Sequence, residues 1–77
     1  MIKVMLFAQL REQVGEAEIK IDAFEGSVKD LLDYLLEKYS LLNIENLMIA
    51  VNEEFSPTDT VLQKGDVVAL IPPVSGG

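Results

Sequence analysis

The chain has 77 residues, of which 49% are hydrophobic and 25% are charged, a composition typical of one compact folded domain. The formal net charge of −7 repels phosphate backbones, so we expect no nucleic-acid partner. The sequence contains neither cysteine nor histidine, which excludes disulfides, zinc sites built on thiolate or imidazole, and Cys–His or Ser–His catalysis.

The sequence shows no membrane segment and no export signal. No apolar run approaches the roughly 20 residues that span a bilayer. The first four residues lack the charged lead and long apolar stretch of a signal peptide. We therefore expect a cytoplasmic protein without membrane contact. Its acidic charge also predicts that a docking partner presents a more basic face.

The first predicted element is a strand over residues 2–8. Its odd positions begin with Lys3 and include Phe7, so the alternation places Phe7 on the face away from the core. The even positions, which we expect to face the core, are Ile2, Val4, Leu6 and Ala8.

A short helix and a second strand are expected next. The helix covers residues 9–15, where Gly15 occupies the C-terminal position that favours glycine. Residues 17–21 alternate between polar and apolar side chains, which predicts an amphipathic strand paired antiparallel with the first.

The clearest predicted element is a helix that begins after Ser27. Ser27 is a suitable N-cap, and Asp30, three residues later, is placed for a capping box and for the positive end of the helix dipole. The apolar positions have the spacing of one helix face that packs on a sheet, and they are Val28, Leu31, Leu32, Leu35, Leu36 and Tyr39.

The second half of the chain is predicted to be mostly β-structure. We expect a strand over residues 48–52, a turn at residues 53–54 leading to Phe55, and a short strand or turn at residues 61–62. A glycine turn at residues 64–66 leads into an apolar strand over residues 67–71 that suits the centre of a sheet. This order predicts a two-layer α+β domain over residues 1–71, with one main helix across a mixed sheet, the β-grasp arrangement.

Residues 72–77 are predicted to form a projecting C-terminal segment, Pro72-Pro73-Val74-Ser75-Gly76-Gly77. The two prolines end the preceding strand and stiffen the base of the segment. The glycines have no Cβ, so this tip can enter a channel too narrow for any other residue. Six residues reach at most about 20 Å. We interpret the segment as an arm made for the active site of another protein.

The reactive group at such a tip is the α-carboxylate of Gly77. It is ionised at neutral pH and inert toward nucleophiles until ATP converts it to an acyl-adenylate. A sulfur donor then gives a thiocarboxylate, whereas a lysine amine gives an isopeptide bond. Because the chain has no cysteine, the terminus is the only carrier atom available for sulfur.

Several motifs together resemble the small subunits of molybdopterin synthase. They are I-K-V-x-L-F-A-x-L-R-E-x-V-G over residues 2–15, A-V-N over residues 50–52, the Gly65-Asp66 turn, and P-P-V-S-G-G over residues 72–77. The resemblance covers the whole chain and is most specific at its two ends.

This resemblance implies a ubiquitin-like β-grasp protein that acts as a sulfur carrier in molybdenum cofactor biosynthesis. It implies that an enzyme similar to ubiquitin E1 proteins adenylates Gly77 with ATP and magnesium, and that a cysteine desulfurase system supplies the sulfur. The tail then enters the large synthase subunit and donates sulfur to cyclic pyranopterin monophosphate, forming the molybdopterin dithiolene. The expected assembly is a heterotetramer in which the large subunit supplies the catalytic side chains. This chain is then no enzyme on its own and binds no cofactor or metal.

The resemblance further implies docking through an exposed apolar patch at Phe7, Phe55 and Ile71. The alternation argument independently places Phe7 away from the core. For Phe55 and Ile71 the strand phase is ambiguous, and core or incidental surface positions stay open.

Three other functions stay open. The first is a sulfur carrier for another pathway, of the kind that serves thiamine thiazole synthesis; it shares the Gly-Gly end but not the Phe-Ala-x-Leu-Arg opening or the Pro-Pro-Val-Ser segment. The second is a ubiquitin-like modifier, whose Gly77 would be joined to lysines. The third is an interaction module in which the tail has no role.

Overall fold

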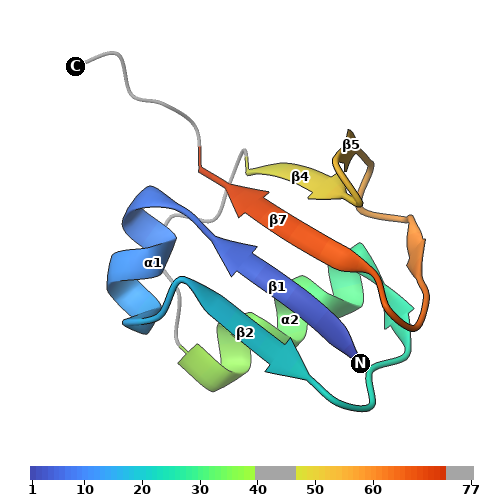
Figure 1. Ribbon diagram of the computed structural model, residues 1–77, viewed down its shortest axis with the longest axis horizontal. Coiled ribbons are helices and arrows are strands. Elements are labelled where there is room, and N and C mark those ends of the chain that lie inside the picture. The colour runs from blue at the N-terminus through green and yellow to red at the C-terminus, as the bar shows by residue number, and fades with distance from the viewer. Residues whose placement is uncertain (40–46, 73–77) are drawn as a thin grey trace.

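A five-stranded mixed sheet forms one layer of the fold in the computed structural model, which describes residues 1–39 and 47–72. The strand order is β2 (Glu18–Ile21), β1 (Ile2–Leu6), β7 (Val67–Ile71), β4 (Met48–Val51) and β5 (Glu54–Phe55). β1 and β7 run parallel, and the other neighbours run antiparallel. Figure 1 shows the sheet facing the viewer with the main helix, α2, behind it. The predicted α+β architecture is confirmed, including the central position of the last strand.

Helix α2 (Val28–Tyr39) begins at a complete capping box, as predicted. The backbone N–H of Ser27 donates to Asp30 Oδ2 at 2.9 Å, and the backbone N–H of Asp30 donates to Ser27 Oγ at 3.3 Å. Gly26 precedes this box with φ +144°, and a Cβ built there would lie 2.7 Å from Asp30 Oδ2. Only glycine fits at this position without displacing the carboxylate.

The capping box makes the stability of the fold depend on pH in the acid range. The backbone N–H of Ser27 lowers the pKa of the Asp30 carboxyl from its ordinary value of 3.8, and the Ser27 hydroxyl adds to this effect. A lowered folded-state pKa means that this contribution is complete above pH 3.8 and is lost as the pH falls through the folded value. We expect Asp30→Asn to be less stable than wild type at neutral pH and the difference to shrink below pH 3.8. Urea unfolding of both proteins at a series of pH values measures this difference in the free energy of unfolding. A difference that does not depend on pH would contradict the prediction.

The hydrophobic core lies between the sheet and α2. The side chains of Val28, Leu31 and Leu35 on α2 are fully buried, as the helical spacing predicts. The even positions of β1 face them, and helix α1 (Ala8–Val14) adds Leu10. The buried cluster consists of Ile2, Val4, Leu6, Leu10, Ile19, Val28, Leu31, Leu35, Ile49, Val51, Leu62, Val68 and Leu70.

The prediction that Ala8 faces the core is wrong. β1 ends at Leu6, and Ala8 is an exposed residue that begins α1 with a φ of 51°. This left-handed backbone conformation breaks the pleat, so the alternation of faces does not reach Ala8. The predicted end of the helix is confirmed: Gly15 has φ 87°, and its N–H donates to the carbonyl oxygen of Arg11 at 2.8 Å.

Three short strands extend the predicted pattern. β3 (Gly26–Ser27) pairs with β6 (Val61–Leu62) in a separate two-stranded sheet. β5 pairs with β4 through a two-residue hairpin turn at Asn52 and Glu53, which have φ values of 52° and 71°. The turn therefore lies one residue earlier than the predicted turn at residues 53–54.

Candidate functional site

The cross-strand register places a set of apolar residues on the sheet face that α2 does not cover. One row runs across four strands from Met5 through Ala69 and Ala50 to Phe55. Residues next to these in each strand, such as Leu70 and Ile49, point to the core. Phe55 therefore belongs to the open face, which the sequence could not decide.

A second row lies at the end of the sheet where β7 stops. Ile71 pairs with Met48 of β4. Leu6, the last residue of β1, pairs with Leu70 of β7. Phe7 directly follows Leu6 and Ile71 directly follows Leu70, so Phe7 and Ile71 lie beside each other. Because the backbone of Phe7 is still extended (φ −126°, ψ 153°), its side chain points to the face opposite Leu6. Phe7 and Ile71 thus lie on the open face, next to the root of the C-terminal segment.

These two rows contain large apolar side chains that are exposed to solvent. The exposed fractions are 69% for Phe55, 47% for Met48 and 41% for Phe7, whereas Ile71 is half-buried. We call Met5, Phe7, Met48, Ala50, Phe55, Ala69 and Ile71 the open apolar face. A contiguous apolar surface of this kind on a small domain is typical of a protein-docking site.

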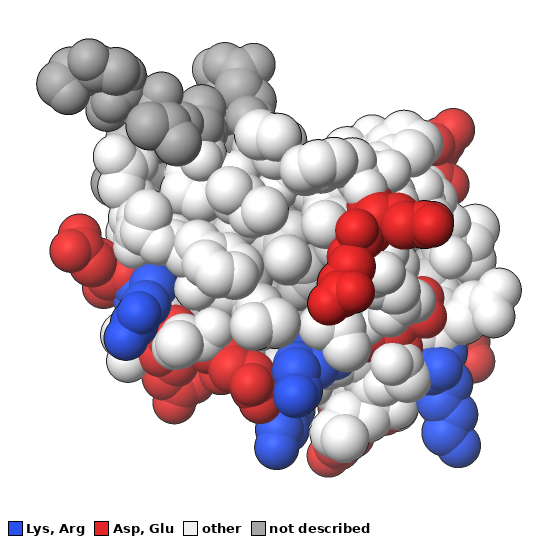
Figure 2. All heavy atoms as spheres, turned by 45° about the horizontal axis from the view of Figure 1, so that its top comes forward, with Lys and Arg blue, Asp and Glu red and all other residues white. Residues whose placement is uncertain are grey.

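Charged side chains bound the open apolar face at the β2 edge. Lys3 Nζ lies 3.7 Å from a carboxylate oxygen of Glu18, and Lys20 Nζ lies 3.9 Å from the other oxygen of the same carboxylate. Figure 2 shows an uncharged surface across the centre and upper part of the molecule, with acidic side chains to its right and basic and acidic side chains together along its lower margin. The charges at this margin are mostly exposed, so they add solubility and orientation more than stability.

The turns at the far end of the sheet are fixed by Asn52. Its Nδ2 donates to Asp66 Oδ1 at 3.0 Å, and its Oδ1 accepts the backbone N–H of Val67 at 3.0 Å. Asp66 also accepts the backbone N–H of Gln63 at 2.8 Å. The network joins the β4–β5 hairpin, which carries Phe55, to the start of β7.

The predicted tail begins where the central strand ends. β7 ends at Ile71, and Pro72 is buried against the domain. The other predicted tail residues, which include the proposed carrier atom, are Pro73, Val74, Ser75, Gly76 and Gly77, and they lie outside the described residues. Within the described part of the chain, the site is therefore the open apolar face together with the root of the tail at Ile71 and Pro72.

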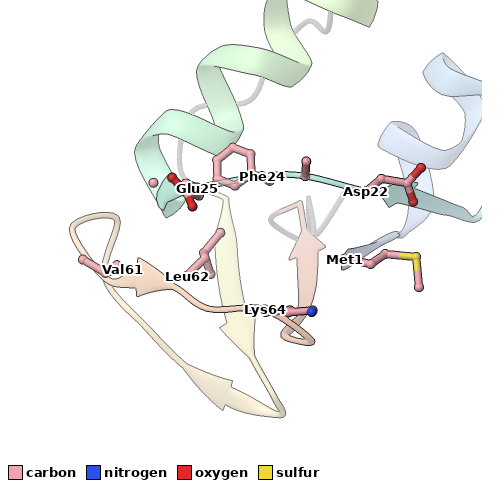
Figure 3. A pocket seen from close by; sticks show the side chains of 9 residues that line it. Met1, Asp22, Phe24, Glu25, Val61, Leu62 and Lys64 are labelled. Carbon is pink, nitrogen blue, oxygen red and sulfur yellow. The ribbon is translucent and has the colours of Figure 1, made fainter.

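A pocket of about 890 Å³ lies at the opposite end of the sheet. It is formed by Met1, residues 22–26 and the segment 61–64, and Figure 3 shows Phe24 and Leu62 in its wall and Lys64 at its margin. Met1 precedes β1, whereas Ile71 lies beyond the other end of the β1–β7 pair. This separation keeps the pocket apart from the root of the tail.

Two further observations bear on the kind of site. Across residues 1–39 and 47–72, no group of three acidic side chains is placed to hold a metal ion. Neither of the two described helices is long and apolar enough to cross a membrane. The groups that this part of the chain offers to a partner are the apolar rows and their charged margin.

The mixed sheet with α2 packed across it defines a small ubiquitin-like β-grasp domain, and comparison with known proteins identifies its family. The sequence matches the ThiS family over residues 4–77. It is 41% identical over 81 residues to the molybdopterin synthase sulfur carrier subunit of Drosophila erecta, covering 99% of this chain and 90% of the relative.

Solved structures of similar proteins share the fold of this chain. SAMP1, a small archaeal modifier protein from Haloferax volcanii, superposes with a TM-score of 0.83 at 29% identity, covering 99% of this chain and 98% of that chain. A chain in the complex of subunits 1 and 2 of molybdopterin-converting factor from Helicobacter pylori 26695 matches with a TM-score of 0.69 at 32% identity, covering 99% and 97%.

The chain belongs to the ThiS family, and within it to the sulfur carrier subunits of molybdopterin synthase. Its function is therefore that of the sulfur-carrying small subunit in molybdenum cofactor biosynthesis, and not that of the catalytic subunit. The predicted family, fold and function are confirmed.

The sequence analysis missed three residues of the open apolar face, Met48, Ala50 and Ala69, and it missed the turn residue Asn52. Met48 is on the open apolar face, but β4 is apolar at every position, so its alternation gives no phase. Asn52 was expected at the end of the strand over residues 48–52 and within the A-V-N motif, and not in a turn. Asparagine tolerates the left-handed backbone conformation better than most residues, and this preference was the sequence signal for the turn that the structure shows at Asn52.

Proposed function

We propose that Gly77 carries sulfur as a C-terminal thiocarboxylate and that the open apolar face docks the chain on the large synthase subunit. The observation that supports this best is the position of the face. Its second row (Phe7, Ile71, Met48) ends where the polypeptide continues into the segment with the two terminal glycines. A protein that binds this face therefore receives the tail beside it.

Loading begins with attack of the Gly77 carboxylate on the α-phosphate of ATP, which releases pyrophosphate and leaves an acyl-adenylate. An adenylating enzyme similar to ubiquitin E1 proteins holds the ATP and magnesium. Sulfur at the level of hydrosulfide, derived from a cysteine desulfurase system, then displaces AMP. The product is the thiocarboxylate, whose sulfur is a better nucleophile than the carboxylate oxygen.

Unloading takes place in the large subunit. The tail inserts through Pro73, Val74, Ser75 and Gly76, and the thiocarboxylate donates its sulfur to cyclic pyranopterin monophosphate. Water then restores the carboxylate of Gly77. The charge of −7 and the lack of cysteine and histidine support a division of labour in which the large subunit binds the anionic substrate and supplies the catalytic side chains. ATP-dependent loading is consistent with a cytoplasmic location.

Intact-mass spectrometry tests the carrier step. The chain, purified and incubated with its adenylating enzyme, ATP, magnesium and a sulfur source, is expected to gain the mass difference between one sulfur and one oxygen atom. A chain that lacks Gly77 is the control and should keep its mass. An unchanged mass in the full chain, while the adenylating enzyme releases pyrophosphate, would contradict the proposal.

A second function is supported by the similarity to SAMP1, a small archaeal modifier protein. The same acyl-adenylate can react with a lysine amine to give an isopeptide bond. Conjugates of higher mass that contain this chain and depend on Gly77 would support it as a protein modifier. If only the thiocarboxylate forms, this second function is ruled out under those conditions.

A further inference from the structure

We propose that Met48 is a positioning residue for sulfur transfer: with its strand partner Ile71 it holds the root of the C-terminal segment against the large subunit. This inference rests on the proposed function of the open apolar face. It adds a residue outside the predicted patch of Phe7, Phe55 and Ile71, and it assigns that residue an effect on the transfer step beyond an effect on affinity.

The first support is the place of Met48 in the sheet. Met48 and Ile71 are the last paired residues of β4 and β7 on this side, and Pro72 follows directly. Pro72 is buried, so the root of the C-terminal segment is anchored to the domain. Within the described residues, Met48 of β4 and Phe7, which directly follows β1, flank this root on the two sides of β7.

The second support is exposure. The Met48 side chain is 47% exposed, while its neighbour Ile49 is 6% exposed and forms part of the core. A large apolar side chain in the second row gains contact area only when a partner covers the face. Methionine is unbranched and adaptable, so it can fill an irregular partner surface.

The third support is the length of the segment, because a small change of angle at its root gives a large displacement of its tip. Five residues follow Pro72 and reach at most about 17 Å. A tilt of about 3° at the root therefore moves a fully extended tip by about 1 Å, and a misplacement of that size can slow a reaction about 100-fold. Phe55 lies two strands away from β7, about 10 Å across the sheet, so it controls this tilt much less than Met48 does.

The experiment uses the thiocarboxylated chain with its large subunit and substrate. Met48→Ala is expected to slow single-turnover sulfur transfer about 10-fold when the large subunit is saturating. Met48→Leu, which conserves volume, should restore the rate. Phe55→Ala should weaken binding but keep the rate at saturation. Val61→Ala is the matched control, because Val61 is 67% exposed and belongs to the other sheet.

The outcomes separate this inference from the proposed function. A Met48→Ala chain that folds, binds more weakly and transfers at the wild-type rate when saturated would overturn the positioning role. Wild-type binding and rate in this variant, with weaker binding in Phe55→Ala, would overturn it too and leave the docking face intact. Wild-type binding in both variants and in Phe7→Ala would reject the docking face itself. Circular dichroism and thermal melting verify that each variant is folded.

Discussion

Replacing Gly77 by alanine is expected to reduce sulfur loading or transfer by about 100-fold or more while leaving the melting temperature near that of wild type. The added methyl group stands next to the reacting carbonyl, where a displacement of about 1 Å has an effect of this size. Stability should not change, because the core cluster and the five-stranded sheet, as far as the structure describes the chain, lie within residues 2–71. Single-turnover assays of loading and transfer, with thermal melting in parallel, measure both quantities.

The control for this prediction is Val61→Ala, which truncates an exposed side chain of the two-stranded sheet, outside the tail and the open apolar face. It should retain most of the activity. A strongly lowered melting temperature in Gly77→Ala would show that the terminal glycine contributes to the folded domain, and the carrier interpretation would then lose its basis.

Replacing Phe55 by alanine is expected to weaken binding to the large subunit at least about 30-fold, which corresponds to about 2 kcal/mol, the effect of truncating an aromatic anchor at an interface. The free chain should keep its stability, because the Phe55 side chain is 69% exposed and contributes little to the core. Isothermal titration calorimetry with the large subunit measures the change in Kd.

Tyr34→Ala is the matched aromatic control for Phe55. Tyr34 is 37% exposed and lies on α2, on the layer behind the sheet, so its loss should leave the affinity for the large subunit unchanged. Equal losses of affinity in the two variants would indicate a general effect of removing surface aromatic residues and would contradict a specific docking face.

The sequence predicted the layers of the fold well because they follow from strong periodic signals. The apolar face of α2 and the capping box at Ser27 and Asp30 are local features, and both are present. The phase of β1 was equally clear, because Lys3 interrupts the apolar residues. The short strands β3, β5 and β6 were harder, since two residues carry no periodicity and their pairing depends on contacts distant in sequence.

The open face itself explains why the site was only partly predictable. Alternation is informative when one face of a strand meets water. β7 is apolar at every position from Val67 to Ile71, because one face packs on α2 and the other belongs to the docking surface. The apolar character that suits this face for a partner therefore removes the alternation of polar and apolar residues in β7. Without that alternation, the sequence could not assign Ile71 to the open apolar face. The tail residues 73–77 stay predictions from the sequence.

The parallel pairing of β1 with β7 bears on how the molecule responds to pulling. A load on the C-terminus acts along β7, and the adjoining strand β1, which begins near the N-terminus, runs in the same direction (Figure 1). Drawing the two ends apart shears the hydrogen bonds between these strands, so they must break together instead of unzipping one after another. A load applied between the two termini is therefore carried by the paired backbone of these two central strands.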